Sequence, residues 1–364
     1  MYLKTLKILN FRNIENIEIE LNKNVNIFIG DNAQGKTSIL ESIYNLAFTK
    51  NSISDEELLK RGTLFYKVKG ILRVGNTLKN LEVLYSENDK KLKINNNEIK
   101  RVSDYISNMN VIMFTPDDLD IIKKSPLIRR NFINMELCQL SNKYLVILNE
   151  YNKILKMRND YIRKNNGHID YKYLDVLTEN LINRMILIYE YREKYFEDIN
   201  KFLDSIFYKI IKKNGLKVVY KKSVSLKDKN NYIEFYKNNY NLDIENGMTM
   251  YGPHRDDFYF SIDNEDLKYY GSQGMQRVAI LSFKLSEINL FKERTGNYPI
   301  ILLDDIFSEL DLSKRKNLLK FIKNGVQFII TTTDINNINE KIISKASVFT
   351  VSKGSIKQRS DISE

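Results

Sequence analysis

The residues from Gly30 to Thr37 have the types and spacing that a triphosphate-binding loop needs. Four residues separate Gly30 from Gly35, and Lys36 and Thr37 follow at once, which is the spacing of a Walker A loop. Glycines let backbone N–H groups point at phosphate oxygens, and the start of a following helix adds partial positive charge. Lys36 would meet the β- and γ-phosphates and Thr37 would hold Mg²⁺. A glycine-rich turn without a ligand is the less favoured alternative. The residues predicted to bind the nucleotide here are Gly30, Asp31, Asn32, Ala33, Gln34, Gly35, Lys36 and Thr37.

A second stretch, from Tyr298 to Asp305, is an apolar run of strand length that ends in two carboxylates. Carboxylates at the end of a central strand beside a phosphate loop hold Mg²⁺ through water and polarise an attacking water. Two adjacent buried acids without a role would be costly, so a chance acidic turn is disfavoured. Asp304 and Asp305 are therefore candidates for metal and water chemistry.

A third stretch, Ser272-Gln273-Gly274, precedes a helical pattern whose apolar residues share one face. A serine and glycine turn at a helix start suits phosphate. A plain N-cap explains Ser272 equally well, so this stretch gains weight only from the two others.

The elements around these motifs predict an α/β fold. Val25, Ile27 and Ile29 form a strand that enters the phosphate loop, and a helix follows the loop. Further strands are expected over Val111–Phe114, the apolar run before Asp304, Val326–Ile330 and Val348–Val351. Two further strands are expected at residues 3–11 and 17–21. Three short β-like runs, at residues 66–74, 80–85 and 91–94, predict an antiparallel sheet beside the nucleotide site.

The residue pattern changes from strand-like to helical at Ser125. Ser125 can cap a helix with Pro126 at its first position. Helical patterning continues to about Lys213, with an interruption near residues 165–168. We therefore expect an inserted helical arm. A further helix is expected from Ser313, as its cap, through Phe321.

The composition excludes several classes of protein. At 364 residues and 43% hydrophobic content the chain can bury a sizeable core. The single Cys138 cannot form an internal disulfide, and the two histidines lie far apart, so a structural zinc site is not expected. The sequence has no run of 18 apolar residues and no signal peptide pattern, so a cytoplasmic protein without a membrane partner is expected.

The net charge of +11 (57 basic minus 46 acidic residues) is concentrated in one segment. Residues 121–248 carry 24 Lys and Arg against 15 Asp and Glu, a surplus of 9, and 13 of the 23 tyrosines. This fits a surface for an anionic polymer, with rings that touch bases. Biased codon usage explains the lysines as well, and packing between helices is the favoured interpretation of any single tyrosine. His254 is interpreted as structural, because no nucleophile or partner carboxylate is identifiable for it.

The motifs taken together, in this order, resemble the SMC-like class of ABC ATPases and, within it, the bacterial RecF family of recombination and repair proteins. The resemblance covers essentially the full length. The motifs that carry it are Asn10 to Asn13, Gly30 to Thr37, Phe114 to Leu119 with Pro126, Arg129 and Arg130, Gly252 to Asp257, Ser272 to Gly274, and Leu302 to Asp311.

This resemblance implies an ATP-dependent homodimer with an ABC-type ATPase head, a mixed central sheet, an antiparallel side sheet and the inserted helical arm or lid. Ser272 and Gly274 of one copy would face the γ-phosphate held by Lys36 of the other. Asp304 would hold Mg²⁺ with Thr37. Asp305 would be catalytic together with Lys36, and its short side chain suits a slow ATPase.

Two further roles are implied in the same way. Asp311 corresponds to an interface residue of the dimer, and Thr332 or Thr333 to the switch residue. Met275 departs from the glutamine usual in the family, which puts the strength of ATP-driven dimerisation in question.

The function that this implies is slow, DNA-stimulated ATP hydrolysis in recombinational repair and replication restart. The protein would bind gapped or junction DNA, single- or double-stranded, and aid recombinase loading with recombination-mediator partners. The implied parts of the chain are 1–120 and 249–364 for the head and 121–248 for the arm. A P-loop kinase or nucleotide transferase, and an architectural DNA-binding protein independent of ATP, are the alternatives.

Overall fold

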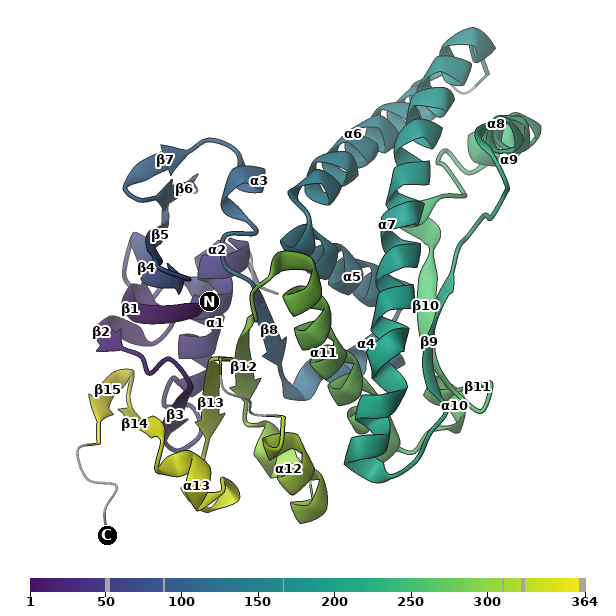
Figure 1. Cartoon of the computed structure of the whole chain (residues 1–364). Coiled ribbons are helices and arrows are strands. Elements are labelled where there is room, and N and C mark those ends of the chain that lie inside the picture. Colours follow the sequence, from purple (N-terminus) through teal and green to yellow (C-terminus); the bar gives the residue numbers. More distant parts are fainter. Residues whose placement is uncertain (50–52, 88, 166, 310, 322–324, 360–364) are drawn as a thin grey trace. The chain divides into compact units, whose positions relative to one another are not determined.

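The computed structural model describes residues 1–49, 53–87, 89–165, 167–309, 311–321 and 325–359 (Figure 1). The chain packs as two compact units. The first unit combines Met1–Leu119, Ser205–Asn214 and Arg277–Glu364, and the second combines Asp120–Asp204 and Gly215–Gln276. The predicted division into 1–120, 121–248 and 249–364 stays a prediction.

A six-stranded mixed sheet lies at the centre of the first unit. Its strands are parallel except for the hairpin of the last two. The three middle strands are buried along their whole length, as expected for parallel strands covered on both faces. In spatial order the strands are β15 (Ser355–Gln358), β14 (Ala346–Ser352), β3 (Val25–Ile29), β13 (Phe328–Thr332), β12 (Ile300–Asp304) and β8 (Val111–Phe114).

A second six-stranded sheet of the first unit is antiparallel throughout. Its hairpins follow the alternation of apolar and polar residues that the sequence shows, and Asn95 and Asn96 take the left-handed backbone conformation of a tight turn. In spatial order the strands are β2 (Ile14–Glu20), β1 (Tyr2–Phe11), β4 (Phe65–Val74), β5 (Thr77–Ser86), β6 (Asp89–Ile94) and β7 (Asn97–Ile99).

Helix α1 (Lys36–Phe48) contacts strands of both sheets, β8, β12 and β13 on one side and β1, β4 and β5 on the other. It is therefore buried almost all round, including Ile39, Leu40 and Ile43. Gly70 on β4 makes this approach possible, because a Cβ there would lie 2.6 Å from a methyl carbon of Leu46 on the helix. The helix after the phosphate loop is thus held between the two sheets.

Apart from one helix that begins in the second unit, the remaining helices of the first unit are short. Residues Pro116–Leu119, Ile306–Glu309 and Ile335–Asn337 form 3₁₀ turns. The α-helices are α2 (Asp55–Leu58), α3 (Val102–Tyr105), α12 (Leu312–Leu319) and α13 (Glu340–Ile343), and α11 (Gln273–Thr295) begins in the second unit.

The predicted start of α12 was wrong. Its cap is Asp311, whose carboxylate accepts a hydrogen bond from the Lys314 N–H at 2.9 Å, and not Ser313. Aspartate caps as well as serine does, and Asp311 comes first, so the helix begins at Leu312.

The second unit is mainly helical but also contains a three-stranded antiparallel sheet that the sequence analysis missed in part. Its strands are β9 (Leu216–Lys221), β10 (Asp257–Ile262) and β11 (Glu265–Asp266). Strand β9 forms because valines and a tyrosine favour a pleated surface over a helix. The helices are α4 (Asp120–Lys123), α5 (Pro126–Leu140), α6 (Asn142–Lys164), α7 (Tyr171–Ile211, which ends in the first unit), α8 (Lys229–Asn238), α9 (Tyr240–Glu245) and α10 (Leu267–Tyr270).

Ser125 lies at the N-cap of α5, as predicted, but its side chain makes no capping hydrogen bond. None of the helices in the described part of the chain is long and apolar enough to cross a lipid bilayer.

The core of the second unit contains aromatic rings and two buried ion pairs. Arg192 lies 3.0 Å from Asp256, and Arg158 lies 2.8 Å from Asp243, with all four side chains almost fully buried. Seven of the thirteen tyrosines between 121 and 248 are buried, which favours packing over base contact for them: Tyr144, Tyr151, Tyr189, Tyr195, Tyr232, Tyr236 and Tyr240.

His254 is bonded at both ring nitrogens within the second unit. Its Nε2 lies 3.0 Å from the carbonyl of Thr249, which can only accept, so Nε2 carries the proton. Its Nδ1 therefore accepts from the Tyr151 hydroxyl, at 2.7 Å. Burial lowers the pKa of His254 from 6.5 to about 4, so the ring is neutral at physiological pH. This arrangement is structural.

The protonation of His254 predicts acid sensitivity. The unfolded chain takes up this proton near pH 6.5 and the folded chain only near 4, so the stability present above pH 6.5 is lost as the pH falls through this window. At pH 5 the expected loss is about 2 kcal/mol. Urea unfolding of the wild type and of His254→Gln at pH 7.5 and 5.0 measures it. The variant should lose less stability than the wild type, and equal losses would contradict the assignment.

Candidate nucleotide-binding site

The loop between β3 and α1 has the backbone of a phosphate cradle. Gly35, directly before the helix, has a φ of 109° and Ala33 has a φ of 63°, so both take left-handed conformations that turn the chain sharply. A Cβ on Gly35 would lie 2.8 Å from the side-chain amide of Asn13. Glycine is thus required at position 35 for conformation and for space.

Lys36 is folded back onto the loop. Its ammonium group donates to the carbonyl oxygens of Gly30 at 2.7 Å and Asp31 at 2.9 Å. Burial lowers the pKa of Lys36, and the nearby carboxylates of Asp305, Asp304 and Asp31 oppose that shift. Phosphate oxygens at this place would be stronger acceptors than the two carbonyls.

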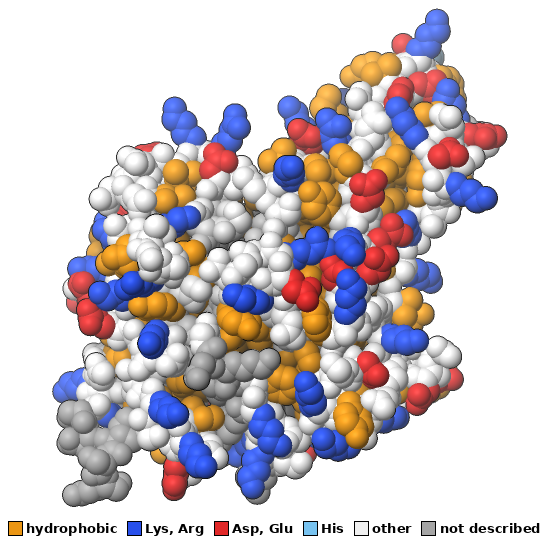
Figure 2. All heavy atoms as spheres, viewed as in Figure 1, with side chains coloured by type: hydrophobic (Ala, Val, Ile, Leu, Met, Phe, Trp, Pro, Cys, Tyr) orange, Lys and Arg blue, Asp and Glu red, His pale blue; other side chains and the backbone are white. Residues whose placement is uncertain are grey.

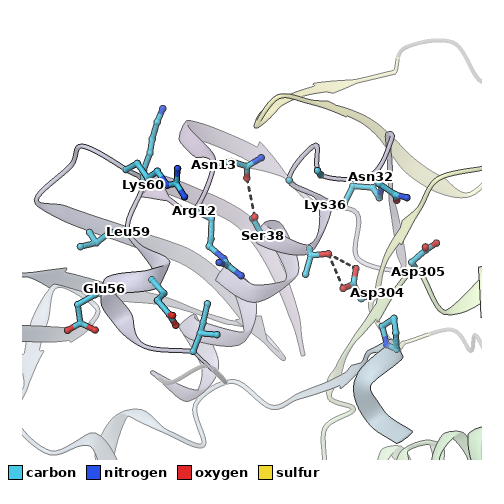
Figure 3. A pocket seen from close by; sticks show the side chains of 17 residues that line it. Arg12, Asn13, Asn32, Lys36, Ser38, Glu56, Leu59, Lys60, Asp304 and Asp305 are labelled. Atoms are coloured by element: carbon cyan, nitrogen blue, oxygen red, sulfur yellow. Dashed lines mark hydrogen bonds between the residues drawn. The ribbon is translucent and has the colours of Figure 1, made fainter. Parts of the chain in front are cut away.

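Asp304 joins the loop helix to two strands of the central sheet. Figure 3 shows its contact with the helix. The Thr37 hydroxyl donates to the Asp304 carboxylate at 3.0 and 3.2 Å, and the Thr331 hydroxyl donates to it at 2.7 Å. Burial raises the pKa of Asp304, and these two hydrogen bonds oppose the shift. The sequence analysis missed Thr331, although its position at the end of a buried strand next to β12 could have pointed to it.

Asp305 has a φ of 46°, which is rare for a residue with a side chain. Its N–H donates to the hydroxyl of Thr331 at 3.1 Å, so the turn after β12 is held by the same threonine as Asp304. Strained backbone of this kind persists where the surroundings impose it.

Asn13 and Arg12 also belong to this site, although the sequence analysis gave them no role. The Asn13 side chain accepts from the Ser38 hydroxyl at 3.1 Å, and Arg12 forms a bidentate pair with Glu41 at 2.9 and 3.0 Å. The feature that could have pointed to these two residues is the turn between β1 and β2, in which Arg12 takes a positive φ of 55°.

The hairpin turn between β14 and β15 supports the loop from another direction. The side chain of Gln34 accepts from the N–H of Lys353 at 2.7 Å, and its carbonyl accepts from Gly354 at 2.9 Å. A Cβ on Gly354 would lie 2.3 Å from the carbonyl oxygen of Asn13, so only glycine fits. Gln34 was predicted to bind the nucleotide. In the structure its side-chain amide accepts a hydrogen bond from the hairpin turn and so holds the loop in place.

These residues line an open cavity of about 1070 Å³ in the first unit. Figure 3 shows Lys36, Asp304 and Asp305 at one end and Glu56 and Leu59 at the other. The cavity exceeds the 300–1,000 Å³ typical of a site for one small ligand. Its lining is Arg12, Asn13, Asn32, Ala33, Gly35, Lys36, Thr37, Ser38, Ile53, Glu56, Glu57, Leu59, Lys60, Arg61, Pro116, Asp304 and Asp305.

The other predicted site residues are not part of this lining. Ser272 and Gly274 are exposed in the second unit, where the Ser272 hydroxyl accepts from the N–H of Met275 at 3.3 Å and so caps α11. Asp311 caps α12 and pairs with Lys314 at 2.6 Å; Leu310, in the same motif, lies outside the described residues.

The two candidate switch threonines differ. Thr332 is buried and bonded to the backbone of Asp334, whereas Thr333 is exposed. The structure thus brings the loop residues together with Asp304 and Asp305, and the remaining roles stay predictions.

Comparison with known proteins gives consistent matches over the whole chain. The family model described as RecF/RecN/SMC N terminal domain matches residues 2–357. The DNA replication and repair protein RecF of Halalkalibacterium halodurans is 38% identical over 370 residues, covering 99% of this chain and all of the relative. RecF of Clostridium botulinum is 40% identical over 98% of this chain and 99% of the relative. The chain belongs to the RecF family.

Solved structures support this assignment. A structure described as the recombination mediator protein RecF with ATP in the RecFOR pathway has a TM-score of 0.90 and 29% identity, over 99% of this chain and 98% of that one. An Smc head domain from Pyrococcus furiosus matches with a TM-score of 0.55 and 15% identity, which shows the fold alone. The predicted ABC-type head with mixed and antiparallel sheets is therefore confirmed, and the RecF fold positions Lys36, Thr37 and Asp304.

The packing of the loop start predicts that Gly30→Ala is destabilising. A Cβ at Gly30 would lie 2.3 Å from the backbone carbonyl oxygen of Val351 on β14, so a strand must move. The expected loss is roughly 1–3 kcal/mol of unfolding free energy, measured by urea denaturation. Gly296→Ala is the control, because nothing lies within 4 Å of its Cβ position and only backbone strain is added. An unchanged urea midpoint for Gly30→Ala would refute the predicted clash.

Proposed function

We propose that this RecF-family chain is an ATP-dependent DNA-binding protein of recombinational repair and replication restart, in which ATP joins two copies and slow hydrolysis releases them. It would bind gapped or junction DNA and aid recombinase loading together with mediator partners. The relatives are DNA replication and repair proteins, which supports a role in that process, and one solved relative is described with ATP. The observation that carries the proposal is the convergence of Lys36, Thr37 and Asp304 in one open cavity.

The donor set fits a magnesium nucleotide. Thr37 and Asp304 offer a hydroxyl and a carboxylate oxygen within hydrogen-bond distance of each other, and such oxygens are the ligands that Mg²⁺ prefers. No cluster of three or more acidic, histidine or cysteine side chains suited to a metal occurs in the described part of the chain. A magnesium ion here would therefore take its other ligands from phosphate and water. Once bound, it would neutralise charge on the phosphates.

A paired arrangement of two copies is supported by the openness of the cavity. The Walker residues hold one side of a triphosphate, and the predicted signature residues, Ser272 and Gly274, are exposed and do not line this cavity. Under the proposal the signature turn of a second copy covers the γ-phosphate. The helix α11 that begins there adds its N-terminal partial charge.

Slow hydrolysis is supported by Asp305. Its carboxylate is one methylene shorter than that of a glutamate, and its backbone is held by Thr331. The carboxylate of Asp305 would reach less far than that of a glutamate at this place, so it would hold the attacking water less closely. The proposed role of ATP hydrolysis is then secondary: dimerisation mainly signals that ATP is bound.

DNA binding is supported by the net charge of +11, but many cations of the second unit are already paired. Lys201, Lys222 and Lys229 lie within 2.6 Å of carboxylates, for example. On the face in Figure 2, Lys and Arg side chains are dispersed and alternate with Asp and Glu. The net positive charge, rather than one dense basic stripe, therefore carries the electrostatic part of the proposal.

Two substitutions test the nucleotide switch. Lys36→Ala removes the cation that would contact the phosphates, so ATP-dependent dimerisation should disappear. Asp305→Asn leaves the loop intact but removes the carboxylate, so hydrolysis should fall roughly 100-fold and dimers should persist. Light scattering with ATP and Mg²⁺, followed over time, measures the dimers, and phosphate release measures turnover. Dimers that form without ATP in both variants would sink this mechanism.

The electrostatic part of DNA binding predicts a regular loss of affinity with salt. The logarithm of the affinity should fall linearly with that of the salt concentration, because phosphate contacts release counterions. Duplex, single-stranded and gapped DNA are compared with and without ATP by fluorescence anisotropy. ATP should strengthen binding in the wild type but not in Lys36→Ala. Equal binding with and without ATP would favour an architectural protein.

A further inference from the structure

Two adjacent tyrosines stand out on the surface of the second unit. Tyr269 and Tyr270 are 73% and 74% exposed, whereas the other strongly exposed tyrosines of the described chain, Tyr171, Tyr173 and Tyr208, are between 44% and 53% exposed. Large aromatic side chains that stay in water lose the free energy that burial would provide. Aromatic side chains are also enriched where proteins bind one another.

The tyrosine pair is held on a fixed support. Gly271 follows the pair, and a Cβ there would lie 2.6 Å from the carbonyl oxygen of Leu267, so the close packing leaves no space for a side chain at this position. The buried side-chain amide of Gln276 donates to the carbonyl of Leu267 at 2.9 Å, and it lies 3.3 Å from that of Gly271. These bonds tie the short helix α10 to α11, so the two rings are displayed with little backbone freedom to lose on binding.

The position of the pair points to its partner. Ser272, the first residue of the predicted signature turn, lies two positions after Tyr270, and it is exposed as well. A surface that brings Ser272 to the γ-phosphate of a second copy also brings the two rings to the edge of that copy's nucleotide cavity. The second copy is therefore the occupant that the geometry favours, and this inference rests on the proposed ATP-dependent pairing.

The nucleotide cavity offers suitable contacts for aromatic rings. Its lining includes the aliphatic side chains of Ile53 and Leu59 and the cations Lys60 and Arg61. Aliphatic groups pack against ring faces and guanidinium groups stack on them. The cavity is open to solvent, so side chains from outside can approach its rim.

We propose that Tyr269 and Tyr270 form an aromatic contact in trans, in which the pair from one copy packs against the rim of the ATP-loaded cavity of the other. The contact would strengthen the dimer next to a signature turn in which Met275 replaces an amide. It would also shield the bound nucleotide from water. The rings would be exposed in the free copy and buried in the ATP-bound pair.

The absence of tryptophan from the sequence allows a direct test. Tyr270→Trp introduces a single indole whose emission should shift to shorter wavelength, with protection from acrylamide, when ATP and Mg²⁺ are added. Tyr173→Trp, another exposed tyrosine, is the matched control and should not change. In the Lys36→Ala background the Tyr270→Trp signal should stay that of an exposed indole.

A second measurement tests how much the two rings contribute to the stability of the dimer, rather than whether they are buried in it. The double variant Tyr269→Ser, Tyr270→Ser should fold like the wild type, because both side chains lie in water, and should bind nucleotide as one copy with unchanged affinity. Its ATP-dependent dimer should dissociate roughly 10- to 30-fold more readily, as expected when an aromatic anchor is lost. Thermal melting and sedimentation with ATP measure the two properties.

The outcomes separate this inference from the proposed function. If the wild type dimerises with ATP while the serine variant dimerises equally well and the indole stays exposed, the aromatic contact is wrong and the ATP switch stands. If the wild type forms no dimer with ATP, both fail. A blue-shifted indole together with a weakened serine dimer supports the contact.

Discussion

The carboxylate of Asp304 is the point on which the nucleotide site depends. It lies at the end of β12, accepts from Thr37 at the start of α1 and from Thr331 at the end of β13, and so connects three elements that come from opposite ends of the sequence. A buried carboxylate is tolerable only with such partners, since desolvation penalises its charge. The same hydroxyls that satisfy it define where a cation could share its oxygens. The contacts that stabilise the carboxyl ends of β12 and β13 are thus the same contacts that position the groups of the site.

In the second unit, buried or partly buried carboxylates are stabilised by arginines. Asp256 is buried beside Arg192 and also accepts from the N–H of Ser223 at 2.8 Å, while the neighbouring Asp257 forms a bidentate pair with Arg129. The motif from Gly252 to Asp257, one of those that carry the family resemblance, is therefore largely a structural junction between helices and the three-stranded sheet. Removing one member of such a pair leaves a buried charge, which typically costs several kcal/mol.

The sequence predicted the parts of the fold that depend on local patterns. The strand, loop and helix around Gly30 and the strand before Asp304 follow from apolar periodicity, glycine spacing and terminal acids, and they lie where expected. It could not identify Thr331 or Asn13, because their role arises from contacts between segments that periodicity does not relate. Strand β9 was missed because a lysine-rich surface hid a short alternation of buried residues. The cap of α12 was misplaced because two equivalent capping residues stand two positions apart.

The contact between Gln34 and the turn at Lys353 and Gly354 bears on how the protein is made. The two partners of the Lys353 to Gln34 hydrogen bond are 319 residues apart in the sequence, and strand β3 lies between two strands that also come late. During synthesis the phosphate loop therefore emerges long before the segments that shape it. A nascent chain therefore holds the residues of the phosphate loop before it holds the strands and the turn that contact the loop, and these contacts form only after the C-terminal segment has been synthesised.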